Sequence, residues 1–133
     1  MNNIKNIDLP PQFRGLENYN IEKLFANLPT PSYVIDEAML KRNGEILKGV
    51  QDRTGCKILL AQKAFSNFNT YGILGKYLAG TEASGLYEAR LGAEAMPEGE
   101  VHVFCGAYKE SEFEELLKYA DHIVFNSVNQ LAK

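Results

Sequence analysis

Short apolar runs alternate with amphipathic stretches from residue 58 to the end of the chain, a pattern that predicts strands followed by helices. The expected strands are residues 58–62, 81–84, 101–105 and 123–125. The expected helices are residues 65–78, residues 86–95 and two further helices opened by capping-box patterns, Ser111–Glu114 and Ser127–Gln130. Successive units are similar in length and leave no room for antiparallel hairpins. We therefore expect right-handed βαβ crossovers and a parallel sheet.

A different pattern precedes these units. Residues 1–29 are expected to be an irregular segment, because Pro10–Pro11 and Gly15 interrupt any regular repeat. Residues 32–35 read as a strand, and Asp36 is a suitable N-cap for a helix that Gly55 ends.

Four strand–helix units are half of what a closed barrel requires. An eight-stranded (β/α)₈ barrel of the TIM type takes roughly 250 residues, and this chain has 133. We therefore expect an α/β fold in which residues 30–133 form the first half of a barrel domain, with the remaining units outside this chain.

Lys63 is the candidate for chemistry. It follows the strand 58–62 on the side shared by Leu59 and Ala61, because side chains alternate along a strand. Barrels of this type place their reactive groups at the carboxyl ends of strands. Partial burial there would favour the free amine, which can attack a carbonyl carbon and form a Schiff base. The simpler alternative is a strand-end lysine with its stem packed and its head in water.

Composition and the amino-terminal sequence argue against several kinds of function. The net charge of −3 gives no support to nucleic-acid binding, and no apolar run approaches membrane-spanning length. The amino terminus lacks the apolar core of a signal peptide. Cys56 and Cys105 are too far apart for a CxxC motif, so we predict packed thiols and no metal site. A cytoplasmic protein is the expectation.

Several segments together resemble carboxynorspermidine/carboxyspermidine decarboxylases, which belong to the alanine-racemase-like enzymes that use pyridoxal phosphate. The segments that carry this resemblance are Thr30–Asp36, Cys56–Phe65, Gly80–Gly92, Glu100–Val103, Ala107–Lys109 and Ala120–Ser127. The resemblance implies a barrel joined to a β-rich second domain, decarboxylation of a carboxylated polyamine substrate in polyamine biosynthesis, and a homodimer. It also implies that residues 1–133 alone are inactive.

The resemblance also implies roles for individual residues. Lys63 would be catalytic and would hold pyridoxal phosphate through a Schiff base, and Ser84 and Glu88 would bind the cofactor. Structural alternatives exist for the last two. Ser84 could be the N-cap of the helix that starts near Leu86, and Glu88 could simply favour the positive end of that helix. His102 and His122 receive no role, since the family's ring-stacking histidine is expected from a later strand.

Other functions remain open at this stage. A non-catalytic carrier of pyridoxal phosphate, built on a single barrel, also keeps a lysine at the first strand. A Schiff-base aldolase without a cofactor usually takes its lysine from a later strand. In a plain α/β domain, Lys63 would be only a surface amine.

An open half-barrel would leave strand edges and an apolar sheet face uncovered. We therefore predict that residues 1–133 alone are poorly soluble and bind no cofactor tightly. Sedimentation and calorimetry of the isolated chain would test this. A soluble monomer with a cooperative thermal transition would contradict the prediction.

Overall fold

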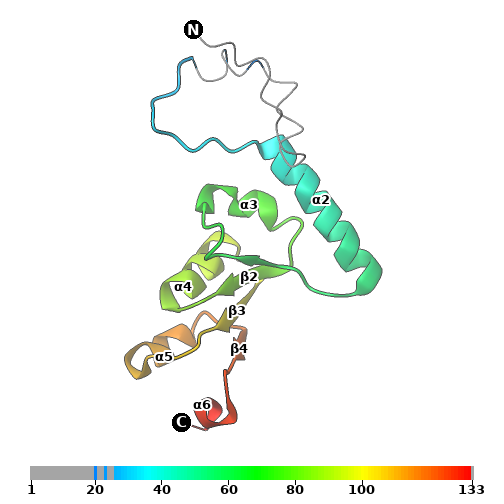
Figure 1. Ribbon diagram of the computed structural model, residues 1–133. Helices are drawn as coiled ribbons and strands as arrows, with labels where there is room; N and C mark the ends of the chain where they lie inside the picture. The colour runs from blue at the N-terminus through cyan, green and yellow to red at the C-terminus, as the bar shows by residue number, and fades with distance from the viewer. Residues whose placement is uncertain (1–19, 21–22, 24–25, 133) are drawn as a thin grey trace. The chain divides into compact units, whose positions relative to one another are not determined.

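The computed structural model describes residues 20, 23 and 26–132 (Figure 1). Contacts divide the chain into two compact units, residues 1–39 and 40–133. The expected irregular segment, residues 1–29, lies mostly outside the described residues.

A four-stranded parallel sheet forms the centre of the second unit. Its strands lie in chain order, β1-β2-β3-β4, and each pairs in parallel with the next. Their bounds are β1 Leu59–Ala61, β2 Gly80–Ala83, β3 Glu100–Phe104 and β4 His122–Val124. The parallel βα order predicted from the sequence is therefore confirmed, with each strand close to its expected position.

One helix precedes the sheet, and the others follow the strands in the order expected for βα units. They are α2 Glu37–Thr54, the 3-10 helix η4 Phe68–Thr70, α3 Tyr71–Leu74, α4 Leu86–Ala95, α5 Glu110–Leu116 and α6 Val128–Leu131. Two predicted end signals are confirmed at α2. The Oδ1 atom of Asp36 accepts a hydrogen bond from Met39 N at 3.0 Å, and Gly55 follows the helix with a φ of +72°.

Helices cover one face of the sheet. Buried Ala83, Val101 and Val103 of β2 and β3 pack with Ala89 of α4 and Leu116 of α5. Figure 1 shows α4 and α5 on the same side of these strands. A second cluster joins the β1 segment to α3 and the end of α4, through Tyr71, Leu74, Leu78, Met96 and their partly buried neighbours Ile58 and Leu60. The opposite sheet face has no such helical layer among the described residues.

The strand expected at residues 32–35 is wrong. Those residues are irregular, Tyr33 is fully exposed and Val34 is half-exposed. A strand requires a hydrogen-bonded neighbour, and every strand of the described sheet lies beyond residue 58.

The long helix expected at residues 65–78 is also wrong, because only η4 and α3 are helical there. Gly72 and Gly75 lower the helix propensity of this stretch. The chain must also return to the sheet quickly, since Ala79 N donates to Ile58 O at 2.9 Å. Tight turns that close on Leu74 O fill the interval.

The N-cap hydrogen bond of one predicted capping box forms, whereas the other box does not form. Ser127 Oγ accepts from Gln130 N at 3.2 Å at the start of α6, as predicted. Ser111 instead lies inside α5, whose N-cap position is Lys109. There the backbone oxygen of Lys109 accepts from Glu112 N, and its amine pairs with the Glu112 carboxylate at 2.8 Å.

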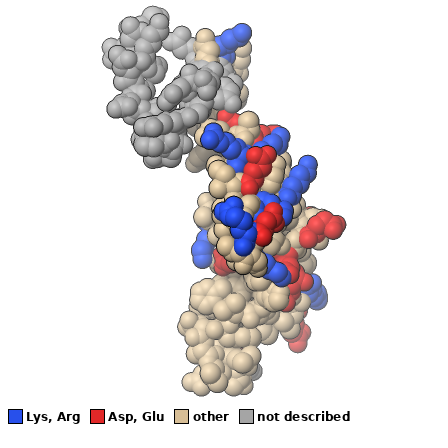
Figure 2. Space-filling view, turned by 90° about the vertical axis from the view of Figure 1, so that its right-hand side faces the viewer, with Lys and Arg blue, Asp and Glu red and all other residues tan. Residues whose placement is uncertain are grey.

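Figure 2 shows Lys and Arg side chains interspersed with Asp and Glu over the middle of the face, without a stripe of Lys and Arg. The bottom end of that face shows no Lys, Arg, Asp or Glu, and residues 122–132 contain none. Among the described residues, no helix is both long and apolar enough to cross a membrane.

The close packing of α4 on the sheet depends on Gly92. A Cβ atom there would lie 2.2 Å from Thr81 Oγ1 and 3.2 Å from Gln62 Nε2. We therefore expect Gly92→Ala to destabilise the full gene product by about 1–3 kcal/mol through overpacking. Urea unfolding would measure this. Gly72→Ala is the matched control, because nothing lies within 4 Å of its added Cβ, and a stability loss equal to that of Gly92→Ala would contradict the packing argument.

Candidate active site

The two faces of the sheet carry different chemistry. One face holds the apolar residues under α4 and α5. On the other face, strand register places Ala61, Glu82, His102 and His122 side by side in one row across all four strands. Alternation along each strand puts polar groups here, where no helix of the described chain covers them.

Lys63 lies on this helix-free face, two residues beyond Ala61. Its Nζ atom lies 3.8 Å from Glu82 Oε2, and Glu82 is on the neighbouring strand β2. The Lys63 side chain is 60% exposed, and that of Glu82 is 20% exposed. The described residues therefore do not provide the predicted shielding of the amine. They place no second layer of side chains over this face.

Ser84 and Glu88 come together at the carboxyl end of β2. Glu88 Oε2 accepts a hydrogen bond from Ser84 N at 2.6 Å, so this carboxylate binds the backbone just before α4. Gly85, not Ser84, occupies the N-cap position of α4. The Ser84 hydroxyl is buried and has no hydrogen-bond partner among the described residues. The alternative that Ser84 caps this helix is thus wrong, and its hydroxyl is free to bind something else.

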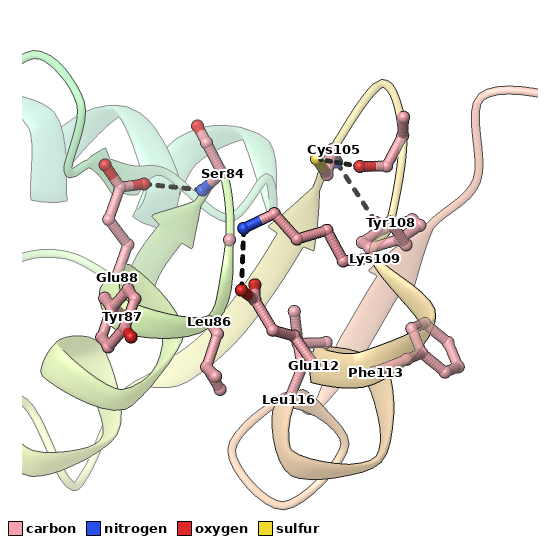
Figure 3. Close-up of a pocket in the computed structure, with 12 residues that line it drawn as sticks. Ser84, Leu86, Tyr87, Glu88, Cys105, Tyr108, Lys109, Glu112, Phe113 and Leu116 are labelled. Atoms are coloured by element: carbon pink, nitrogen blue, oxygen red, sulfur yellow. Dashed lines mark hydrogen bonds and ion pairs between the residues drawn. The ribbon is translucent and has the colours of Figure 1, made fainter.

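A cavity of about 390 Å³ opens between the starts of α4 and α5, and Ser84 and Glu88 line it (Figure 3). Its other side is formed by the segment after β3, where Lys109 points across toward the Glu112 carboxylate. Tyr108 anchors this segment, because its hydroxyl donates to Val124 O at 2.8 Å and accepts from Cys105 N at 3.2 Å. Lys63 is not among the residues that line this cavity.

Gln62 is a site residue that the sequence did not single out. It is 1% exposed, and its Nε2 donates to Glu88 O at 2.8 Å. Its Oε1 accepts from Tyr71 OH at 3.1 Å. Burial, and then the negative charge of Glu88, raise the pKa of Tyr71, which keeps that hydroxyl protonated as a donor. Gln62 therefore fixes the end of β1, next to Lys63, against both α3 and α4. The available signal was a polar side chain on the otherwise apolar side shared by Ile58 and Leu60.

Three further polar residues meet on the helix-free face. His102 Nε2 lies 2.8 Å from Glu100 Oε2, and His122 Nε2 lies 3.6 Å from the same oxygen. Lys57 Nζ donates to the other oxygen, Glu100 Oε1. Hydrogen bonds from Lys57 first, and then from His102, lower the pKa of Glu100 to about 2. This carboxylate is therefore ionised at any ordinary pH.

Curated proteins similar in sequence to this chain are named as decarboxylases. The chain is 39% identical over 109 residues to a carboxynorspermidine/carboxyspermidine decarboxylase of Campylobacter jejuni, covering 82% of this chain and 28% of that protein. A protein of the same name from Herminiimonas arsenicoxydans is 36% identical over 80% of this chain. A carboxyaminopropylagmatine decarboxylase of Synechocystis is 37% identical over 79%. No family model matches the chain.

A solved structure supports the same relationship. The crystal structure of the Campylobacter jejuni carboxynorspermidine decarboxylase, in complex with norspermidine, superposes with a TM-score of 0.76 at 40% sequence identity. The match covers 79% of this chain and 28% of that one.

The fold is thus the first half of a TIM-type barrel, built from four parallel βα units. Over about four fifths of its length, the chain is homologous to carboxynorspermidine/carboxyspermidine decarboxylases, which confirms the resemblance seen in the sequence. The chain spans a little more than a quarter of the length of the curated relatives that it matches.

The two hydrogen bonds of Gln62, to Tyr71 and to Glu88 O, predict different stability losses for two variants. Tyr71→Phe removes one hydrogen bond and should cost about 0.5–1.5 kcal/mol of stability. Gln62→Leu leaves both Tyr71 OH and Glu88 O without their buried partner, and should cost about 1–3 kcal/mol for each group that stays unsatisfied. Denaturant unfolding of the full gene product would measure both. Equal losses in the two variants would contradict the conclusion that Gln62 stabilises the fold through two separate hydrogen bonds.

Proposed function

We propose that this chain is part of a pyridoxal-phosphate-dependent decarboxylase that acts on carboxynorspermidine or carboxyspermidine. The observation that carries the proposal is the position of Lys63. It is a lysine at the carboxyl end of the first barrel strand, on the face that a closed barrel turns inward, in a chain homologous to named decarboxylases.

The described residues fit the cofactor at two points. Lys63 has an amine on the inner face, which would hold the aldehyde carbon of the cofactor. Ser84 has a buried hydroxyl without a partner, and it would donate to or accept from a polar atom of the cofactor. Bound pyridoxal phosphate supplies an electron sink for the pair left behind when carbon dioxide departs.

The residues of this chain then have distinct tasks. Glu82 is the only acidic group that the structure pairs with Lys63 among the described residues, so it can orient the amine and receive a proton from its ammonium form. Gln62 holds the strand end that carries Lys63. Glu88 is bonded to Ser84 N, so its contribution to cofactor binding would be to position the backbone that presents the Ser84 hydroxyl.

The wider assignment rests on the relatives. A carboxylated polyamine substrate fits their names, and we propose it for the full gene product. We also propose a homodimeric enzyme and a cytoplasmic location, which the sequence resemblance implies. The alternative of a non-catalytic carrier of pyridoxal phosphate is not favoured, because each of the relatives above is named as a decarboxylase.

Borohydride reduction tests the role of Lys63 directly. After reduction of the full gene product with pyridoxal phosphate, mass spectrometry should find a pyridoxyl group on the peptide that contains Lys63. Lys63→Ala should lose this adduct and release no carbon dioxide from carboxynorspermidine. Lys63→Arg should also fail, because a guanidinium stays protonated and forms no imine. Lys76→Ala, at an exposed lysine after α3, is the control and should keep both. Turnover by Lys63→Ala would exclude the mechanism.

Ser84→Ala tests the second point of fit. Loss of one hydrogen bond, worth about 0.5–1.5 kcal/mol, should raise the Kd for pyridoxal phosphate by about two- to tenfold. Fluorescence titration of the full gene product would measure it. Ser111→Ala, at an exposed serine of α5, should leave the Kd unchanged. An unchanged Kd in Ser84→Ala would remove this residue from the cofactor site.

A further inference from the structure

The cluster formed by Glu100, His102 and His122 is not used by the chemistry proposed above. Each of the three residues offers one ligand atom, and these atoms all lie within 4.8 Å of one another. Glu100 and His102 belong to β3, and His122 belongs to the adjacent strand β4. Paired strands hold their Cα atoms in fixed register, so the donors are already gathered before any ligand arrives.

The spacing suits a transition-metal ion. With bonds of about 2.0–2.2 Å, two donors on one tetrahedral zinc ion lie about 3.5 Å apart. His122 Nε2 lies 3.6 Å from Glu100 Oε2, close to that value, whereas the 2.8 Å contact of His102 Nε2 with the same oxygen is a hydrogen bond that metal binding would replace. The imidazole rings lie together with centroids 4.3 Å apart and a tilt of 32°, and both Nε2 atoms lie within 3.6 Å of the same carboxylate oxygen.

The chemistry of the donors selects the class of ion. Two imidazole nitrogens with one carboxylate favour zinc or a similar first-row ion, whereas magnesium and calcium prefer sites made wholly of oxygen ligands. Lys57 holds Glu100 Oε1, which leaves Oε2 available as a single-oxygen ligand. Hydrogen bonding to the outer oxygen of a ligating carboxylate is a common way to orient such a ligand.

We propose that Glu100, His102 and His122 form a binding site for a divalent zinc-class ion on the helix-free face of the sheet. The ion takes three protein ligands, and water or a further ligand completes its coordination. Because the ligands come from both β3 and β4, the ion ties these two strands together. The sequence gives little sign of this site, because twenty residues separate His102 from His122, and only the parallel register brings them together.

Cobalt binding tests the proposal with a visible signal. Titration of the chelator-treated full gene product with Co²⁺ should give a d–d absorption band that saturates at one equivalent. Zn²⁺ should displace Co²⁺ and remove the band, since zinc binds such sites more tightly. This experiment uses the wild-type protein, so its outcome does not depend on whether a variant folds. Absence of a saturable band would overturn the proposal and would show that the three residues form only a hydrogen-bonded network.

Variants then assign the ligands. His102→Gln, His122→Gln and Glu100→Gln should each weaken Co²⁺ binding at least tenfold, whereas Glu98→Gln should not change it. Glu98 is exposed and only two residues from Glu100, which makes it a matched control. Circular dichroism would confirm that each variant keeps the wild-type fold. A band that survives in the His102→Gln/His122→Gln double variant would place the ion elsewhere and would also overturn the proposal. Neither result depends on Lys63 or on decarboxylation.

Discussion

The alternation of side chains along four parallel strands, combined with helices on only one face, is the constraint on which the rest of this structure depends. The residues packed under α4 and α5 are mostly apolar, as Ala83, Val101 and Val103 show, and their burial stabilises that face. The residues between them point the other way, so Glu82 and His102 are carried to the helix-free face without breaking the core. The same strands therefore supply stability on one side and reactive groups on the other.

Side-chain hydrogen bonds hold the strand ends in place, where regular strand pairing stops. Gln62 joins the end of β1 to Tyr71 and to the backbone of Glu88. Tyr108 performs a comparable task between the ends of β3 and β4, through hydrogen bonds to Cys105 N and Val124 O. These contacts matter for function because a reactive side chain at a strand end is positioned only as well as the backbone that carries it.

The sequence predicted the order of elements well, because each strand and helix carries its own local pattern. It failed where distant residues decide the outcome. Residues 65–78 do not form the expected helix, because Gly72 and Gly75 weaken it and because Ala79 must reach Ile58, a contact that local spacing does not predict. Lys63 was found from its place at the end of a strand. Glu82 and the two histidines were not assigned roles, because their proximity to one another or to Lys63 arises from strand register rather than from spacing along the chain.

The placement of the histidines has a practical consequence. The chain contains two histidines, and both lie in contact on one spot of the sheet, on neighbouring strands. The imidazole resonances of His102 and His122 would therefore both report on the junction of β3 and β4. The protein carries a built-in probe of that junction, which would register loss of strand register without any introduced label.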